Sequence, residues 1–167
     1  MAPKTDQGSL LKFIEENKRI IFKICNVYCK NRHDREDLQQ EIIYQLWRSY
    51  PTYKPEYKFT TWMYRVALNI AISFYRKTKL SDNIITLDEP VEIEDKPDNT
   101  SEIEKNISTL YQFINDLNKL DKALMLLYLE EKSYNEIAEI LGISETNVAT
   151  KISRIKEKLK RQFKTTQ

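Results

Sequence analysis

The stretch Ser133–Lys160, SYNEIAEILGISETNVATKISRIKEKLK, predicts two helices joined by a tight turn. Ser133 is followed three positions later by Glu136, and this pair forms a capping box that starts the first helix directly after the serine. Gly142 supplies the left-handed residue that ends this helix, and Ser144 can cap the next one. A connection this short is typical of the helix-turn-helix motif.

The second of these helices has one apolar stripe and one polar stripe. Its apolar residues recur at the spacing of a single buried face, and they are Val148, Ile152, Ile155 and Leu159. Beside them lie Asn147, Thr150, Lys151, Arg154 and Lys158. Short polar groups can approach base edges, and Lys or Arg reaches guanines or phosphates, so this face suits the DNA major groove. An ordinary helix pair in a bundle would show the same stripes with solvated lysines, and that alternative stays open.

The composition predicts an all-α chain. Only 2 Gly and 5 Pro occur in 167 residues, hairpin signals are missing, and apolar residues repeat at three and four positions rather than two. A hydrophobic fraction of 41% can bury one medium core or two small ones. No apolar run reaches membrane-spanning length, and residues 1–17 carry charges throughout. We therefore expect a cytoplasmic protein without membrane insertion.

Metal binding and catalysis find little support in the sequence. Cys25 and Cys29 lie four residues apart on a predicted apolar helix, which favours buried free thiols. A zinc site would need ligands beyond this pair, and His33 is the only histidine. No glycine-rich phosphate loop or nucleophile paired with a base is present. We expect neither an enzyme nor a protein with a cofactor.

Charge is strongly segregated along the chain. Residues 1–80 hold 15 basic and 8 acidic side chains, for a net charge of +7. Residues 81–109 hold 2 basic and 9 acidic ones, for −7, and residues 110–167 hold 10 and 8, for +2. The middle segment also has Pro90 and Pro97, so we expect a flexible acidic linker between two helical domains. A polyanionic strand can also occupy a groove built for nucleic acid.

Aromatic and basic residues interleave in Tyr50–Lys79. Thr60 or Thr61 can cap a helix with a polar stripe at spacings of three and four, formed by Arg65, Asn69, Ser73, Arg76 and Lys77. The loop before it contains Tyr53, Lys54, Tyr57, Lys58 and Phe59. Rings in such a loop can stack on unpaired bases while lysines hold the backbone, although Phe59 and Trp62 fit a small core equally well.

The run DREDLQQEIIYQLWRSYPTYKPEYKFTTWMYRVALNIAISFYRK, from Asp34 to Lys77, resembles extracytoplasmic-function sigma factors, the smallest members of the sigma-70 family. The acidic linker and the closing helix-turn-helix follow it in the order that this family uses. The resemblance implies that residues 1–80 form a region that docks on core RNA polymerase and reads and melts the minus-ten promoter element. Residues 110–167 would read the minus-thirty-five element, with residues 81–109 as the linker.

The resemblance also implies a role for single residues. Docking on the clamp coiled coil of the polymerase would fall to Asp34, Glu36, Asp37, Leu38, Gln40 and Glu41, with Leu38 as an apolar anchor. Contacts to the minus-ten element would come from Tyr57, Lys58, Arg65, Asn69, Ser73, Arg76 and Lys77, with Asn69 and Ser73 facing bases. Contacts to the minus-thirty-five element would come from Asn147, Thr150, Lys151, Ser153, Arg154 and Lys158.

The sequence departs from the common pattern of this family at two positions. Ala149 and Ser153 are small where many relatives carry larger side chains, which leaves the base preference open.

Expected partners are core RNA polymerase, through its clamp coiled coil and its flap, promoter DNA, and an anti-sigma factor. Two other classes of protein stay open: a dimeric DNA-binding regulator, and an adaptor that binds only protein. Neither explains both the acidic docking segment and the aromatic segment that follows it.

Overall fold

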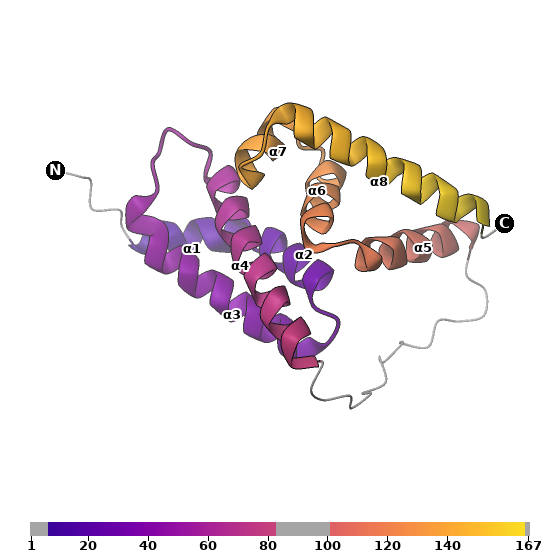
Figure 1. Ribbon diagram of the computed structural model, residues 1–167. Helices are drawn as coiled ribbons and strands as arrows, with labels where there is room; N and C mark the ends of the chain where they lie inside the picture. The colour runs from indigo at the N-terminus through magenta and orange to yellow at the C-terminus, as the bar shows by residue number, and fades with distance from the viewer. Residues whose placement is uncertain (1–6, 83–100, 166–167) are drawn as a thin grey trace.

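The computed structural model describes residues 7–82 and 101–165, and those residues form helices without a strand (Figure 1). The helices are α1 (Gln7–Glu16), α2 (Lys18–Tyr28), α3 (Arg32–Ser49), a 3-10 turn (Tyr50–Thr52), α4 (Phe59–Asp82), α5 (Glu102–Asp116), α6 (Lys119–Leu129), α7 (Tyr134–Leu141) and α8 (Glu145–Thr165). The all-α prediction is confirmed. In α4, side chains are described as far as Phe74.

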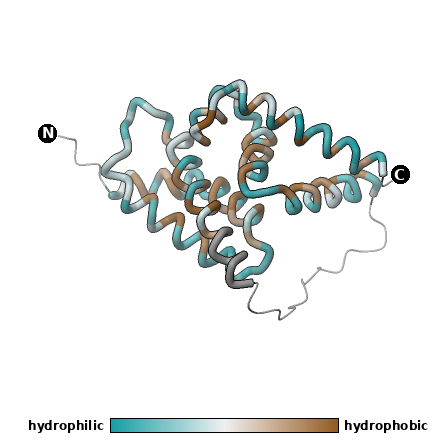
Figure 2. The backbone as a smooth tube through the Cα atoms, viewed as in Figure 1, coloured by the Kyte–Doolittle hydropathy of each residue, from teal (hydrophilic) through white to brown (hydrophobic). Residues whose placement is uncertain are grey.

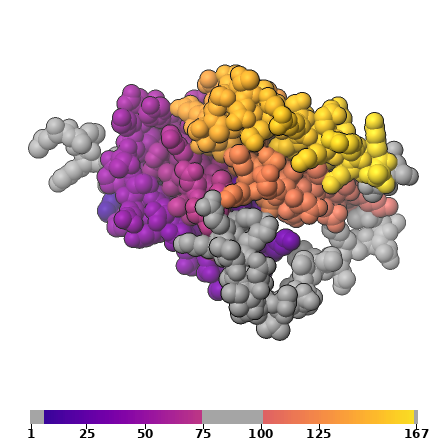
Figure 3. All heavy atoms as spheres, viewed as in Figure 1, coloured from indigo at the N-terminus to yellow at the C-terminus, as the bar shows by residue number. Residues whose placement is uncertain are grey.

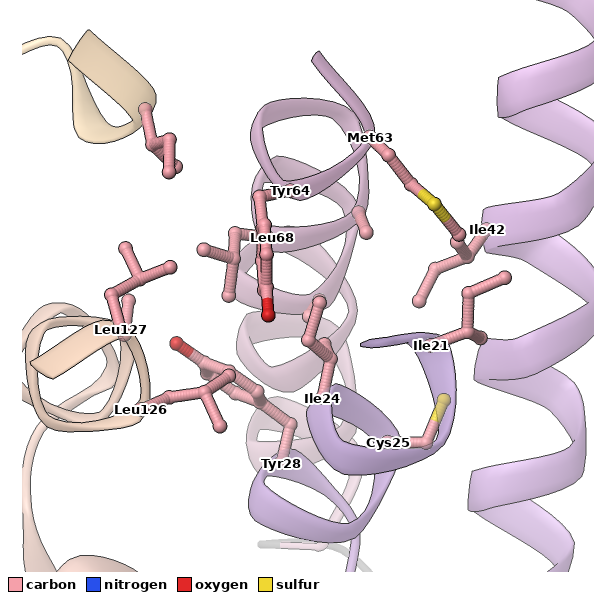
Figure 4. Packing of buried hydrophobic residues seen from close by; sticks show 14 of the residues in the cluster. Ile21, Ile24, Cys25, Tyr28, Ile42, Met63, Tyr64, Leu68, Leu126 and Leu127 are labelled. Atoms are coloured by element: carbon pink, nitrogen blue, oxygen red, sulfur yellow. The ribbon is translucent and has the colours of Figure 1, made fainter. Parts of the chain in front are cut away.

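Helices α1 to α4 form the first bundle, in which α2, α3 and α4 pack against one another. Helix α3 begins where the Asn31 side chain accepts a hydrogen bond of 2.7 Å from the main-chain N–H of Asp34. Its buried residues fall four apart, at Leu38, Ile42 and Leu46, and Ile42 lies beside Ile21 and Met63 in the core (Figure 4). This packing fixes which faces of α3 and α4 remain open to solvent.

Helices α5 to α8 form the second bundle and contain the helix-turn-helix as predicted. The Ser133 hydroxyl accepts from the Glu136 N–H at 3.1 Å, and the Glu136 carboxylate accepts from the Ser133 N–H at 2.9 Å. Gly142 ends α7 with φ at +68°, and the Ser144 hydroxyl accepts from the Asn147 N–H at 3.1 Å. The capping box, the left-handed glycine and the second cap are therefore confirmed.

The two bundles pack against each other and share one hydrophobic core. Helix α2 contacts α5 and α6, and α4 contacts α6 and α7. Figure 4 shows Tyr28 and Leu68 of the first bundle facing Leu126 and Leu127 of α6. The space-filling view shows the atoms of the two bundles meeting (Figure 3), and the helices on both sides of this junction contain apolar residues (Figure 2). We call this junction the seam.

The expected linker is shorter than its composition indicated. Residues 102–109 were predicted as part of it, but they are the first turns of α5. The Ser101 hydroxyl accepts a hydrogen bond from the Glu104 N–H at 3.3 Å. The negative charges of Glu102 and Glu104 lie in the first turn of α5, where the positive end of the helix dipole stabilises them. The negative charge that suggested a linker thus partly stabilises a helix start. Ser81 and Asp82 of the predicted linker are the last residues of α4, and its residues 83–100 lie outside the described residues.

Candidate nucleic-acid and partner interfaces

The outer face of α8 carries the six residues predicted to contact the minus-thirty-five element. Val148, Ile152 and Ile155 are buried, so the opposite side of the helix faces solvent. That side exposes Asn147, Thr150, Ser153, Arg154 and Lys158, and Lys151 is half-buried beside them. The Thr150 hydroxyl donates to the Thr146 carbonyl at 3.0 Å, which leaves its oxygen free to accept. Short acceptors and cations therefore share one exposed surface.

Two lysines of α8 lie near side chains of the neighbouring helices α5 and α6. Lys156 lies 4.2 Å from the centroid of the Tyr128 ring, so it packs inward on α6. Lys158 lines a groove of about 570 Å³ at the junction of α5 and α6, together with Arg161 and opposite Asp116 and Asp121. These carboxylates offset part of the positive charge near the middle of α8. Away from this groove, the predicted DNA contacts Asn147, Thr150 and Arg154 lie in the amino-terminal half of α8.

A second polar face runs along α4. Arg65, Asn69 and Ser73 are exposed and recur every fourth residue, while Met63, Ala67, Leu68 and Ala71 are buried on the other side. The predicted stripe is thus assembled as far as Ser73. Arg76 and Lys77 continue the same helix, and their side chains lie outside the described part of the chain. The face offers one amide, one hydroxyl and one guanidinium for contacts with nucleic acid.

The aromatic residues before α4 form a packed cluster. The rings of Tyr53, Phe59 and Trp62 lie with centroids 5.1 to 5.8 Å apart. These rings are half-buried, so packing rather than base stacking occupies Phe59 and Trp62. The Tyr53 hydroxyl donates to the Tyr57 carbonyl at 2.7 Å and so fixes the loop. Tyr57 itself remains 52% exposed, with Lys58 next to it.

The acidic face of α3 is exposed, but its predicted apolar anchor is not. Glu36, Asp37, Gln40 and Glu41 face solvent, and Asp34 is half-buried near the helix cap. Leu38 has 0% exposure and packs in the core of the first bundle. The assignment of Leu38 as an exposed docking anchor was therefore wrong. It lies on the same stripe as Ile42 and Leu46, which a helix turns inward.

Two exposed aromatic residues on α3 were missed. Tyr44 is 51% exposed and Trp47 is 50% exposed, and both lie on the helix that carries the acidic face. Large aromatics are usually assigned to a core from sequence, which is why these two were not singled out. The available signal was the spacing of Leu38, Ile42 and Leu46, because that stripe leaves no inward position for Tyr44 or Trp47.

The described residues show neither a metal cluster nor a spanning helix. No group of three or more His, Cys, Asp or Glu residues within 7–82 and 101–165 is placed to hold a metal ion. Across the same residues, no helix has the length and apolarity to cross a membrane. Cys25 and Cys29 are free thiols and buried, as predicted. Burial raises the pKa of Cys25 to about 11 and that of Cys29 to about 12.

Comparison with protein families gives two matches in chain order. The family model for Sigma-70 region 2 matches residues 13–80, and the one for Sigma-70, region 4 matches residues 107–159. The ECF RNA polymerase sigma factor SigM of Bacillus subtilis is 30% identical over 137 residues, which cover 78% of this chain and 80% of SigM. The ECF RNA polymerase sigma factor SigW of the same organism is 28% identical and covers 96% and 92%.

Two solved structures share the fold. One is CnrH in complex with the cytosolic domain of CnrY, with a TM-score of 0.70, 16% identity, and coverage of 98% of this chain and 93% of that one. The other is the sigma factor RpoE of Bartonella quintana in complex with the anti-sigma factor NepR. Its TM-score is 0.67, its identity is 18%, and coverage is 92% and 97%.

Proposed function

Because the chain belongs to the extracytoplasmic-function RNA polymerase sigma factors of the sigma-70 family, we propose that it directs core polymerase to promoters with a minus-ten and a minus-thirty-five element. As a sigma factor it is a transcription initiation factor and not an enzyme. The observation that carries the promoter proposal is the pair of exposed polar faces on α4 and α8. On each helix, the buried apolar residues on the opposite side orient the polar face toward solvent, and both faces belong to one chain.

In this proposal the first bundle binds polymerase and the minus-ten element. The assignment keeps residues 1–80 as this unit and residues 110–167 as the minus-thirty-five unit, and it adds the start of α5 from Glu102 to the second unit. Asp37 and Glu41 form a charged rim on α3, and Tyr44 and Trp47 supply the apolar centre that Leu38 cannot. Aromatic residues at the centre of a polar rim are the arrangement typical of energetic hot spots. This face would dock on the clamp coiled coil.

The exposed face of α4 would hold the opened strand. Asn69 and Ser73 can form hydrogen bonds with the edges of an unstacked base, and Arg65 can reach a phosphate. Tyr57 can stack on a neighbouring base because its ring is exposed on a loop that the Tyr53 hydroxyl fixes. Flipping a base costs a few kcal/mol, and these stacking and hydrogen-bond contacts would offset that cost.

The outer face of α8 would read the minus-thirty-five element in the major groove. Asn147 and Thr150 present short polar groups, and Arg154 presents a cation that can bind guanine or phosphate. The cations are few, and Lys158 lies opposite the two carboxylates across its groove. The affinity of the free protein for DNA should therefore be weak and strongly dependent on salt. Contact with the polymerase, including its flap, would supply the remaining binding energy.

An anti-sigma factor is the further partner that we propose. Both similar structures are complexes, one with the cytosolic domain of CnrY and one with the anti-sigma factor NepR. The present chain has the same fold and exposes apolar side chains on more than one helix, including Tyr44 and Trp47 on α3 and Ile103 and Tyr111 on α5. Such surfaces mark sites of protein interaction.

The test combines polymerase binding with promoter opening. Purified protein and core polymerase are mixed with promoter DNA, and permanganate reactivity reports unpaired thymines near the minus-ten element. We expect opening that depends on the protein, and about tenfold less opening for Asn69→Ala, because each base contact contributes about 1 to 3 kcal/mol. Asn115→Ala on the exposed side of α5 is the matched control. Absence of protein-dependent opening with an active core polymerase would contradict the proposal.

A further inference from the structure

The turn between α6 and α7 holds the second bundle against the first. Glu130 in this turn forms an ion pair with Lys23 of α2, and its carboxylate lies close enough to the Tyr64 hydroxyl of α4 for its charge to raise the pKa of that hydroxyl. Lys132 lies 5.6 Å from the centroid of the Tyr64 ring. Tyr64 is only 3% exposed, and burial together with the Glu130 charge raises its pKa to about 12. One carboxylate therefore lies against two helices of the opposite bundle.

The backbone of the turn is fixed in a way that aims Glu130 at these partners. Three main-chain hydrogen bonds of 3.0 to 3.1 Å close it, from the N–H groups of Glu130, Glu131 and Lys132 to carbonyls at the end of α6. Glu131 adopts φ of 58°, a left-handed conformation that is strained for a residue other than glycine. The surrounding hydrogen bonds maintain this conformation, so the turn is a formed element of the seam.

A second ion pair joins the DNA-reading parts of the two bundles. The Lys58 ammonium lies 3.8 Å from the carboxylate of Glu136, in the first turn of α7. Lys58 is one of the residues that we propose for the minus-ten element. In this closed arrangement it faces a carboxylate of the helix-turn-helix, which would repel a DNA phosphate from the same place. The closed arrangement thus competes with DNA at this lysine.

In the closed arrangement, the two faces proposed to contact DNA also lie too close together to reach both promoter elements at once. The two elements lie about 25 base pairs apart, or about 85 Å of duplex at about 3.4 Å for each base pair. Asn147 follows Glu136 by eleven residues, which span at most about 40 Å even when fully extended. Since Glu136 contacts Lys58, the start of the α8 reading face lies far less than 85 Å from the minus-ten face. Simultaneous reading of both elements requires the seam to open.

We propose that the α6–α7 turn is an intramolecular latch, in which Glu130 holds the free protein closed through its ion pair with Lys23, and that this pair must break and the turn must move away from Tyr64 before both promoter elements can be bound. This inference rests on the proposed function. Leu68, Leu126 and Leu127 form the apolar part of the seam, and burial of apolar surface does not require one precise orientation of the two bundles. The ion pair between Glu130 and Lys23 forms in only one relative orientation of the bundles. Breaking this pair should loosen the seam while each bundle keeps its own core.

Covalent closure tests the latch directly. Lys23→Cys and Glu130→Cys are combined and joined with a short bis-maleimide, to which the buried Cys25 and Cys29 are poorly accessible. We expect the cross-linked protein to lose transcription from a promoter that carries both elements, and the untreated double variant to retain it. Each single variant treated with the same reagent is the control. Full transcription by the cross-linked protein would overturn the latch, whereas failure of every variant and the wild type would count against the proposed function.

Charge reversal gives an independent test on the free full-length chain. Glu130→Lys should shift the ratio of open to closed protein about tenfold toward open, because it removes a charged hydrogen bond and adds repulsion from Lys23. Small-angle scattering should then show a larger radius of gyration, and Lys23→Glu combined with Glu130→Lys should return it toward the wild-type value. Glu139→Lys on the exposed side of α7 makes the same charge change away from the seam. An unchanged radius in Glu130→Lys with intact circular dichroism would contradict the latch.

Discussion

The Tyr28 hydroxyl of α2 donates a hydrogen bond of 2.6 Å to the main-chain carbonyl of Lys119 in the first turn of α6. The Lys122 ammonium lies 6.0 Å from the centroid of the same tyrosine ring. These contacts connect the segment that matches Sigma-70 region 2 with the segment that matches region 4. Tyr28 is buried and its hydrogen bond is partly buried, so the bond forms part of the packed seam.

Removing the Tyr28 hydroxyl should weaken the seam without leaving a cavity. We expect Tyr28→Phe to lower the free energy of unfolding by about 1 kcal/mol, the usual net contribution of one hydrogen bond. Urea denaturation followed by circular dichroism measures this change. Tyr44→Phe, on the exposed face of α3, should change the same free energy by less than about 0.5 kcal/mol. Equal effects of the two variants would show that the Tyr28 bond contributes nothing specific.

Leu38 and Asp37 are adjacent in sequence, but a substitution at Leu38 should reduce stability and one at Asp37 should reduce polymerase binding. Leu38→Ala removes a fully buried side chain and should cost about 2 to 5 kcal/mol of stability. Asp37→Arg changes an exposed residue, so it should leave thermal stability unchanged and weaken binding to core polymerase. Thermal melting and pull-down with core polymerase separate the two outcomes. A stable Leu38→Ala protein that fails only in binding would restore Leu38 as a docking residue.

Trp47 should matter for polymerase binding more than for folding. Its ring is half exposed, and truncation of a central aromatic in an interface usually costs more than 1 kcal/mol, or roughly tenfold in affinity. We expect Trp47→Ala to weaken binding to core polymerase by about that factor, as measured by fluorescence anisotropy. Phe22→Ala, which truncates an exposed aromatic on α2, is the control. Unchanged affinity for Trp47→Ala would remove this residue from the docking surface.

Arg154 should contribute to DNA binding mainly through its charge. If it contacts a phosphate, Arg154→Ala should reduce the slope of log affinity against log salt by about 1. If it reads a guanine, the variant should instead relax base preference at one position of the minus-thirty-five element. Salt titrations of the polymerase complex with matched and mismatched promoters distinguish these cases. Lys12→Ala removes an exposed cation from α1 and serves as the control, since it should change neither slope nor preference.

Stability should decrease at alkaline pH because two thiols are buried. Burial raises the pKa values of Cys25 and Cys29 to about 11 and about 12, whereas an unfolded thiol ionises near about 8.5. Their contribution is therefore complete below the unfolded pKa and is lost as pH rises toward the folded values. Urea unfolding at about pH 8 and about pH 10 should show lower stability at the higher pH. The Cys25→Ala/Cys29→Ala variant should show a smaller decrease, and an equal decrease would assign the effect to other groups.

Local signals in the sequence were sufficient to predict the helix-turn-helix. Ser133, Glu136 and Gly142 act on backbone groups within a few residues of themselves, so their effect does not depend on the rest of the fold. The stripe of Val148, Ile152 and Ile155 then orients α8, and the exposed positions follow from helix geometry. For the same reason the polar stripe of α4 could be placed from its spacing.

Features that depend on tertiary packing could not be predicted in this way. Leu38 is a different case: the resemblance placed it on the polymerase, although its spacing with Ile42 and Leu46 already indicated a buried stripe. Composition placed residues 102–109 in a linker, and the Ser101 cap shows that the same acids suit a helix start. The ion pair of Glu130 with Lys23 joins residues far apart in the chain, and no periodic pattern indicates such a contact.

Transcription with purified components tests the central claim most directly. Core polymerase, the wild-type protein and a library of genomic fragments are combined, and the start sites of the resulting RNA are mapped. We predict starts that depend on the protein and share two upstream elements, centred about 25 base pairs apart, whose use is lost in Asp37→Arg. Transcripts that do not depend on the protein, with an active core polymerase and a folded chain, would contradict the assignment of promoter-directing function.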